Sequence, residues 1–416
     1  MTTLMLVEPE ATGHRMILYV RLIVAEALAR GWRVILLTTA SATLHPACKA
    51  VVSEFGARLR IVLMPDVARG GSGQLDLLRA QYLSIRAFQA GYRAVSRHDR
   101  VDFVYLPYFN YIDKVVGWYG SPFGNVLFGG MMVAARFHHY KCGIAGVSGK
   151  QDKINELLFR LALRVPNFEL LTSIDEPLET YVHYAIPRHS RKFRYVPDVS
   201  SIRQPCERIS ARATYGFSAT DFVVVSYGSL SPRKGLAKLL TLFGAPDLPS
   251  YFRLLLVGSQ DADAQRMVSG FISRHPEREM QLVIVDRFVT DVEEGQVFAC
   301  ADVVWLCYEN FSGMSGVLIQ SAQAGVPVVT AGDGLIERNR KKHALGIQWG
   351  EFAIADNAGM RFDWSRLINS VSAMSGSASL RKFAGAHAPQ AFGRNVIDAI
   401  AAARTRRAVS EQCPVS

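Results

Sequence analysis

Apolar runs of strand length alternate with helix-like segments along the first half of the chain. Residues 3–8 (TLMLVE) form such a run, residues 14–31 repeat apolar positions at helical spacing up to Gly31, and residues 32–39 (WRVILLTT) form the next run. A strand, a helix and a second strand in this order predict parallel strands joined by a crossover helix. The same pattern predicts further strands over 59–65, 102–108, 168–173 and 192–198, and helices over 73–97 and 153–165.

A polar stretch over residues 199–221 interrupts this alternation, which then restarts. The second series of apolar runs predicts strands over 222–228, 252–259, 282–288, 302–308 and 327–332, with helical segments between them. We therefore expect α/β architecture with two doubly wound, Rossmann-like domains, over 1–198 and 222–380, joined by a linker at 199–221. Residues 381–416 are expected to end in a helix, and whether it packs back on the first domain stays open.

The composition supports two sizeable domains, and the net charge indicates which chemical classes of binding partner are favoured. The 416 residues are 49% hydrophobic and 20% charged, which suits large cores and argues against global disorder. The formal net charge of +11 favours acidic partners such as phosphates, nucleic acid or an anionic membrane face.

Cysteine usage and apolar runs indicate a cytoplasmic protein. None of the six cysteines forms a C-x-x-C pair, so no zinc site is expected and the thiols are typical of a reducing compartment. The N-terminal MTTLMLVEPE lacks the basic start of a signal peptide, and the most apolar stretch, 125–137, is too short to span a bilayer.

Candidate ligand-binding residues follow predicted strands, where doubly wound sheets bind their ligands. The loop over 7–15 carries Gly13 and His14 before a helix, and a glycine there permits a tight turn while the helix start offers amide donors. Gly228 ends a strand, and Arg233 and Lys234 follow before the next helix, an arrangement that can clamp a phosphate although it is not a Walker loop. Ordinary turns with solvated side chains are the alternative at both places.

A third loop consists of small residues ahead of a short helix. Ser312, Gly313, Ser315 and Gly316 precede the helical segment that starts at Val317. Small residues at a helix start expose backbone amides to an anion.

Taken in order, several segments resemble the GT-B glycosyltransferases, and most closely the retaining enzymes of family 4. Residues 13–39 resemble the family's opening loop, helix and second strand, and YGSLSPRKGLAKLL resembles the start of its donor domain. LLLVGSQDA, VDRFVTDVEEGQVFACADVVWLCY and SGVLIQSAQAGVPVVTAGDGLIERNRKKHALG resemble its middle and end, so the resemblance covers nearly the whole chain.

The resemblance implies a fold, a reaction and a donor site. It implies two domains facing each other across a cleft, with the acceptor on the N-terminal side and a nucleotide-diphosphate sugar held by the C-terminal domain. Lys234 matches the family's diphosphate-binding lysine. The partner arginine usually follows the first glycine, where this chain has Ser229, and Arg233 is the candidate substitute. We assign a catalytic role to Lys234 and Arg233, and also to His14 in the opening loop.

The sequence departs from the family at its paired glutamates. The second glutamate falls on Gln320, and the first on Ser312, or on Glu309 if the loop has an insertion. An amide still hydrogen-bonds ribose hydroxyls but carries no charge. A polar helix residue without a ligand is the alternative for Gln320, and Gln320→Glu is expected to be tolerated because the family has a carboxylate there. The predicted donor-binding residues are Gly13, Gly228, Ser229, Arg233, Lys234, Glu294, Ser312, Gly313, Ser315, Gly316, Val317 and Gln320.

No metal and no cofactor beyond the donor sugar are expected. Asp261 and Asp263 form an Asp-x-Asp in a loop that varies within the family, which favours solvated acids over a metal site. His138 and His139 are candidates for the acceptor side, with a core or surface histidine pair as the alternative. The resemblance implies a glycan or lipid-linked acceptor, and the basic segments 188–194 and 404–407 suit peripheral contact with an anionic membrane. No nucleic-acid partner is expected.

Three other functions compete with transfer. An inactive GT-B binding module would explain the missing glutamates, and a GT-B epimerase shares the same fold. A Rossmann dehydrogenase is disfavoured because the opening loop lacks G-x-G-x-x-G. The sugar, the base, the acceptor and the oligomeric state stay open.

Overall fold

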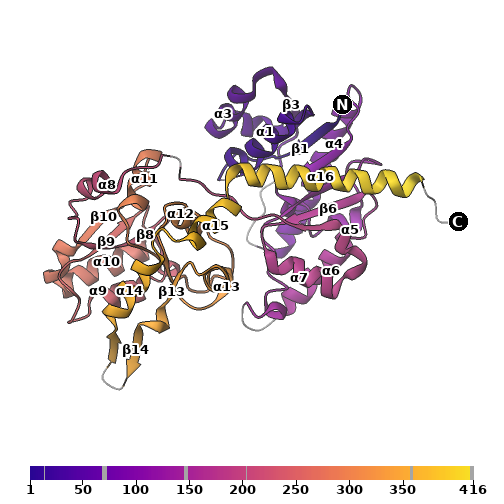
Figure 1. Cartoon of the computed structure of the whole chain (residues 1–416). Coiled ribbons are helices and arrows are strands. Elements are labelled where there is room, and N and C mark those ends of the chain that lie inside the picture. Colours follow the sequence, from indigo (N-terminus) through magenta and orange to yellow (C-terminus); the bar gives the residue numbers. More distant parts are fainter. Residues whose placement is uncertain (14, 68–72, 145–148, 203, 357–358, 413–416) are drawn as a thin grey trace. The chain divides into compact units, whose positions relative to one another are not determined.

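The computed structural model describes the chain except residues 14, 68–72, 145–148, 203, 357–358 and 413–416, and the side chains of 356 and 408–412. The chain divides into two compact units (Figure 1). The first unit comprises Met1–Asp198 and Pro389–Ser416, and the second comprises Val199–Ala388.

A parallel sheet of seven strands forms the centre of the first unit, in the order β3-β2-β1-β4-β5-β6-β7. Its strands are β1 (Thr3–Val7), β2 (Arg33–Thr39), β3 (Leu59–Met64), β4 (Phe103–Leu106), β5 (Phe128–Met132), β6 (Phe168–Ser173) and β7 (Phe193–Tyr195). Its helices are a π-helix (Arg15–Val20) that leads into α1 (Arg21–Ala29), then α2 (Ala40–Leu44), α3 (Pro46–Phe55), α4 (Gln74–Ser96), α5 (Val116–Tyr119), α6 (Lys150–Ala162), α7 (Glu176–Ala185) and α16 (Pro389–Gln412). The strand residues are mostly buried, as a sheet covered on both faces requires.

The C-terminal helix α16 belongs to the first unit, where it packs on α1 and β6 (Figure 1). The rings of Tyr19 and Phe392 stack with centroids 5.1 Å apart. Gly393 permits this approach, since a Cβ there would lie 2.6 Å from the carbonyl oxygen of Leu22. Arg30 adds an ion pair to Asp398 at 2.7 Å.

A parallel sheet of six strands forms the centre of the second unit, in the order β10-β9-β8-β11-β12-β13. Its strands are β8 (Phe222–Tyr227), β9 (Phe252–Val257), β10 (Leu282–Val285), β11 (Val303–Leu306), β12 (Val328–Thr330) and β13 (Gly346–Gln348), and β14 (Ala353–Asp356) and β15 (Gly359–Phe362) form a separate antiparallel pair. Its helices are α8 (Arg208–Thr214), α9 (Leu236–Phe243), α10 (Ala262–Arg274), α11 (Asp291–Cys300), α12 (Gly316–Gln323), α13 (Gly334–His343), α14 (Trp364–Met374) and α15 (Ala378–Ala386).

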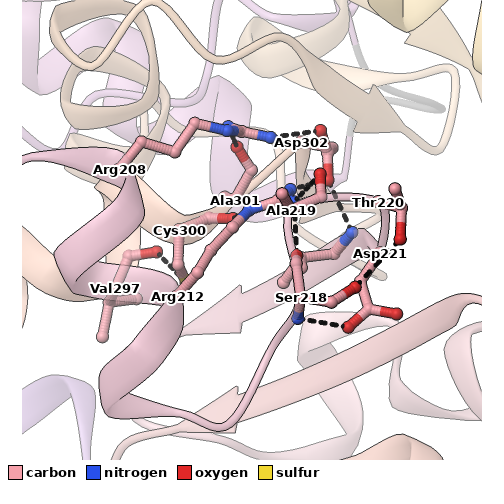
Figure 2. Close-up of polar contacts among 11 residues, drawn as sticks. Arg208, Arg212, Ser218, Ala219, Thr220, Asp221, Val297, Cys300, Ala301 and Asp302 are labelled. Atoms are coloured by element: carbon pink, nitrogen blue, oxygen red, sulfur yellow. Dashed lines mark hydrogen bonds and ion pairs between the residues drawn. The ribbon is translucent and has the colours of Figure 1, made fainter.

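The fold class predicted from the sequence is confirmed, because both units are doubly wound parallel sheets with helices. The segment 199–221, predicted as a linker, lies in the second unit and contains α8, which packs on α11. The buried guanidinium of Arg212 fixes this helix: it donates to the carbonyl of Cys300, to the carbonyls of residues 218 and 219, and to Asp302 at 2.6 Å (Figure 2). Strand β5 lies within the apolar run 125–137, where no strand was predicted.

Candidate functional site

The sharp turn after β8 places Lys234. Gly228 follows the strand with a φ of +100°, a short 3-10 helix spans Pro232–Lys234, and Gly235 with a φ of +72° leads into α9. A side chain at Gly235 is excluded, because its Cβ would lie 2.0 Å from the carbonyl oxygen of Cys307. The glycine after Lys234 is therefore required by close contact between this turn and the segment after β11.

The ammonium group of Lys234 is held beside the ends of β8 and β11. Its Nζ donates to the carbonyl oxygen of Tyr227 at 2.9 Å and to the hydroxyl of Tyr308 at 2.6 Å, and the residue is only 7% exposed. A Cβ on Gly228 would lie 3.1 Å from Nζ, so the glycine leaves room for the ammonium group.

Arg233 lies next to Lys234 on the exposed side of the turn. Its guanidinium group lies 5.0 Å from the ring centre of Phe311 and 5.6 Å from that of Tyr308. Within the described part of the chain, no ion pair joins Arg233 or Lys234 to a carboxylate. Neither cation is therefore paired with a protein carboxylate there. Arg233 is exposed, and the buried ammonium group of Lys234 has one donor hydrogen beyond the two that Tyr227 and Tyr308 accept.

This location is the topological switch point of the second sheet. Strand β8 pairs with β9 on one side and with β11 on the other, so the strand order reverses between β8 and β11. Ligands of doubly wound sheets bind outside the carboxyl ends of the strands at such a point. The small-residue loop from Ser312 to Gly316 also follows β11 and leads into α12, with Ser315 buried and extended immediately before the helix.

The structure joins two predicted residues that lie far apart in the sequence. Gln320 on α12 donates from Nε2 to Oε1 of Glu294 on α11 at 2.8 Å. The same carboxylate oxygen accepts from the hydroxyl of Tyr227 at the end of β8, at 2.9 Å. Tyr227 therefore adjoins both this acid–amide pair and, through its carbonyl oxygen, Lys234.

The two positions that can match the first of the family's paired glutamates, Glu309 and Ser312, lie in the loop after β11. Glu309 forms an ion pair with Lys238 of α9 at 2.7 Å, and its backbone amide donates to the carbonyl of Arg233. The carbonyl of Ser312 accepts from the amide of Leu335 at the start of α13. Glu309 thus serves to attach this loop to the basic turn.

The switch point of the first sheet, between β1 and β4, contains a cluster that sequence reasoning missed. Glu8 follows β1 and is fully buried; its Oε1 accepts from the hydroxyl of Tyr111 at 2.7 Å, and Oε2 has no hydrogen-bond partner among the described residues. Arg15 donates to that tyrosine hydroxyl and to Glu10 at 2.6 Å, and its guanidinium group lies 4.7 Å from the ring centre of Tyr108. Burial raises the pKa of Glu8 to about 7, against the opposing effect of Arg15.

The sequence offered one signal for this cluster, because the acidic Glu8 ends an otherwise apolar run that opens the chain. Gly13, in the same loop, adopts a φ of +68°, which favours glycine. His14, to which a catalytic role was assigned, lies outside the described residues.

His138 and His139 are buried side chains of the first unit rather than surface groups. Their Nε2 atoms lie 3.0 Å and 2.6 Å from the same oxygen of Asp175, which follows β6. Burial lowers the pKa of His138, so its neutral form is favoured. These three residues are the one group within the described ranges whose ligand atoms are close enough to share a metal ion. His139 is hydrogen-bonded to Asp175, whereas neither ring nitrogen of His138 has a hydrogen-bond partner among the described residues.

The remaining acids have local roles. Asp261 caps α10 by accepting from the amide of Ala264 at 2.8 Å, and Asp263 pairs with Arg266. Asp198 accepts from the hydroxyl of Tyr19 at 2.8 Å, which ties the end of the first unit to its π-helix. No helix in the described part of the chain is long and apolar enough to cross a membrane.

Comparison with known proteins identifies the fold. No family model and no curated protein sequence matches the chain. Among solved structures, sucrose-phosphate synthase from Thermosynechococcus elongatus is similar with a TM-score of 0.67 and 16% identity, over 99% of this chain and 100% of that one. The fold is that of the GT-B glycosyltransferases.

Of two other similar structures, one is a complex with a nucleotide sugar and the other is a glycosyltransferase of lipopolysaccharide biosynthesis. HepE from Anabaena, in complex with UDP-glucose, has a TM-score of 0.59 and 14% identity over 96% of this chain and 100% of its own. WaaG, a glycosyltransferase involved in lipopolysaccharide biosynthesis, has a TM-score of 0.55 and 14% identity over 95% of this chain and 98% of its own.

Proposed function

We propose that this protein is a glycosyltransferase that moves a hexosyl or related sugar from a nucleoside-diphosphate sugar to a glycan or lipid-linked acceptor. The observation that carries this proposal is the pair of cations, Arg233 and Lys234, at the switch point of the second sheet. They contact Tyr308 and Phe311 in the segment that leads from β11 to α12. The solved structures of the same fold include a complex with UDP-glucose, which supports a nucleotide-sugar donor.

In the proposed reaction the protein stabilises the departing nucleoside diphosphate. Negative charge grows on the diphosphate as the glycosidic bond breaks, and fixed cations and backbone amides stabilise this change more in the transition state than in the ground state. By analogy with the loss of one oxyanion donor, removal of one such group costs about 2.7–4 kcal/mol of transition-state stabilisation. The roles proposed are diphosphate binding for Lys234, Arg233 and the 315–317 amides, and ribose binding for Glu294 and Gln320.

The resemblance to family 4 is the basis for proposing retention of the anomeric configuration. Retaining enzymes of this fold are thought to react on the face from which the diphosphate departs, and no protein nucleophile is assigned here. An NMR assignment of the anomeric configuration of the product tests the stereochemical proposal.

We also propose that the reaction needs no metal. We propose further that the protein works at the cytoplasmic face of a membrane, which its basic segments contact peripherally.

The test of the main proposal is donor binding followed by donor turnover. UDP, GDP, ADP and their sugars are screened by thermal shift, because a ligand that binds the folded state raises the melting temperature. Hydrolysis of the stabilising nucleotide sugar is then measured without an acceptor, since water slowly replaces the acceptor in many transferases.

Each competing function predicts a different result. An inactive binding module binds a glycan or a nucleotide without turnover, whereas an epimerase converts the donor sugar without releasing the nucleotide. If no nucleotide or nucleotide sugar binds the folded protein, the transferase proposal is wrong.

A further inference from the structure

A basic cavity lies in the first unit, remote in the sequence from the Lys234 turn. It encloses about 220 Å³. It is lined by Arg160, Arg164, Ala185, Ile186, Pro187, Arg188 and His189. These residues come from the end of α6, from the end of α7 and from the 3-10 helix that follows it (Pro187–Lys192).

The cavity lies at the amino ends of the parallel strands, whereas doubly wound sheets bind their substrates at the carboxyl ends. Helix α6 ends shortly before β6 begins, and the 3-10 helix leads directly into β7, so the cavity adjoins the amino ends of β6 and β7. Glu8, Tyr111 and Asp175 all follow strands at the carboxyl edge. A ligand in this cavity would therefore bind apart from the reaction that we propose.

Two of the three arginines that line the cavity have no carboxylate partner among the described residues. Arg160 is committed to Glu156, at 2.9 Å, and to the carbonyl of Ala185. Arg164 and Arg188 are exposed, and no ion pair joins either of them to a carboxylate in the part of the chain that the structure describes. Two guanidinium groups thus face solvent at the rim without a protein counter-ion.

Neighbouring basic residues add positive charge, and one acid, Glu169, acts electrostatically on both Lys192 and Arg406. The amino group of Lys192 is buried and donates to the carbonyl of Leu163 at 3.2 Å. The Nε of Arg406, on α16, is buried without a hydrogen-bond partner within the described ranges. Partial burial lowers the pKa of His189, and so do its basic neighbours Lys192, Arg164, Arg191 and Arg188. Such mutual repulsion costs folding free energy, which a bound anion would offset.

Guanidinium groups bind phosphate oxygens in paired hydrogen bonds, and a cavity of this size accommodates one phosphate group with a small substituent. We propose that this cavity is a binding site for a phosphate group, supplied either by an anionic lipid headgroup or by a soluble phosphate ester, with Arg164 and Arg188 as its principal ligands. The proposal does not depend on transferase activity, because it concerns binding at a different edge of the molecule.

The test compares binding by the wild type with binding by Arg164→Gln/Arg188→Gln. Glycerol 3-phosphate and inorganic phosphate are titrated by calorimetry, and sedimentation is measured with phosphatidylcholine vesicles that contain phosphatidylglycerol, oleate or neither. The control is Arg58→Gln/Arg79→Gln, which removes two exposed arginines of the first unit that lie elsewhere, one before β3 and one on α4. Thermal unfolding checks that both variants fold.

The cavity variant is expected to lose about tenfold or more in affinity for the phosphate probe that the wild type binds, while the control keeps it. Binding of phosphatidylglycerol vesicles but not of the soluble probes identifies a lipid headgroup as the source, and the reverse identifies a soluble ester. The proposal is overturned if the wild type binds no phosphate probe, if oleate vesicles bind as well as phosphatidylglycerol vesicles, or if both double variants behave alike. A soluble probe that binds at Lys234 instead is recognised because the cavity variant retains it.

Discussion

Gln320 donates its side-chain hydrogen bond to Glu294, with 2.8 Å between Nε2 and Oε1. The resemblance to glycosyltransferase family 4 implies a glutamate at this position of α12; the chain has Gln320, and a carboxylate from α11 touches its amide. The pair keeps one negative charge at the switch point rather than none. This contact changes the effect that Gln320→Glu is expected to have on donor binding.

Gln320→Glu is expected to weaken nucleoside diphosphate binding by roughly tenfold, because it sets two carboxylates in contact in a buried place. Sequence reasoning alone expected the opposite, since it could not place Glu294 beside this position. Calorimetric affinity for the best nucleoside diphosphate measures the effect. Gln320→Leu should also weaken binding, because it leaves the ribose hydroxyl that we assign to Gln320 unpaired, at a cost of about 1–3 kcal/mol.

The charge-swapped variant Glu294→Gln/Gln320→Glu is the matched control. It keeps one acid and one amide in contact and should recover most of the affinity that Gln320→Glu loses. If Gln320→Glu binds as tightly as the wild type, the Glu294 contact does not govern the donor site.

Lys234→Ala should weaken nucleoside diphosphate binding by about tenfold or more, because a hydrogen bond to a charged group contributes roughly 1.5–3 kcal/mol. Lys382→Ala is the control, because this lysine is exposed on α15, away from the Lys234 turn in the sequence. Thermal unfolding in parallel separates a binding role from a structural one, since Lys234 also bonds to Tyr308. A Lys234→Ala protein that folds less stably yet binds with unchanged affinity contradicts the donor-site assignment.

Most strands of both sheets could be predicted because they are apolar runs. Strand β13, which has only three residues, was not predicted. Strand β5 was missed because Gly129 and Gly130 break its pattern. Both glycines allow close packing of the strands: a Cβ on Gly129 would lie 2.3 Å from the carbonyl oxygen of Leu170, and one on Gly130 would lie 2.9 Å from that of Leu106. Helix α8 was missed because its segment is polar and basic. What anchors it is Asp302, about ninety residues further along the chain, and local pattern does not show such a contact.

The candidate site was predicted in part. Position after a strand identified Gly228 and Lys234, because the carboxyl ends of neighbouring parallel strands meet at one edge. The contacts among Tyr227, Glu294 and Gln320 depend on how α11 and α12 pack, which no spacing in the sequence specifies. The acceptor candidates His138 and His139 are buried against Asp175, so their pairing could be seen only in the structure.

The stability of the first unit should fall as the pH rises through the range in which Glu8 ionises. The folded pKa is raised from 4.5 to about 7, so between these values the folded state retains a proton that the unfolded state has lost. The free energy of unfolding then decreases with pH, by about 3 kcal/mol once the pH exceeds the folded pKa. Glu8→Gln lacks this ionisation and should gain stability relative to the wild type between pH 5 and pH 8.

Urea unfolding of both proteins across this pH range measures the difference. Glu54→Gln, at a solvent-exposed carboxyl of α3, is the control and should follow the wild type. Parallel curves for Glu8→Gln and the wild type would mean that Glu8 titrates normally.

Arg212→Ala should destabilise the second unit by about 3–5 kcal/mol, because it removes a buried cation that donates to Asp302 and to the carbonyls of Cys300 and of residues 218 and 219. Figure 2 shows its contacts with Asp302 and with backbone carbonyls. Arg208→Ala is the comparison, since Arg208 pairs with the same aspartate at 2.5 Å but is 45% exposed, and its loss should cost about 1 kcal/mol or less. Equal effects in denaturant unfolding would show that burial does not distinguish the two arginines.

Donor turnover should survive the removal of metal ions. In the proposed site Lys234 and Arg233 supply the positive charge that Mg²⁺ or Mn²⁺ supplies in metal-dependent transferases, and the amides at the start of α12 donate hydrogen bonds to the diphosphate. The Asp-x-Asp at Asp261 and Asp263 is committed to a helix cap and to Arg266. Donor hydrolysis is measured after dialysis against EDTA and again after addition of Mg²⁺, Mn²⁺ or Zn²⁺, with Lys234→Ala in parallel. We expect the wild-type rate to change little and the variant rate to be low throughout. A wild-type rate that EDTA abolishes and one metal restores would contradict this charge assignment. A metal that rescues Lys234→Ala alone would instead support it, because a metal cation would then be replacing the missing ammonium group.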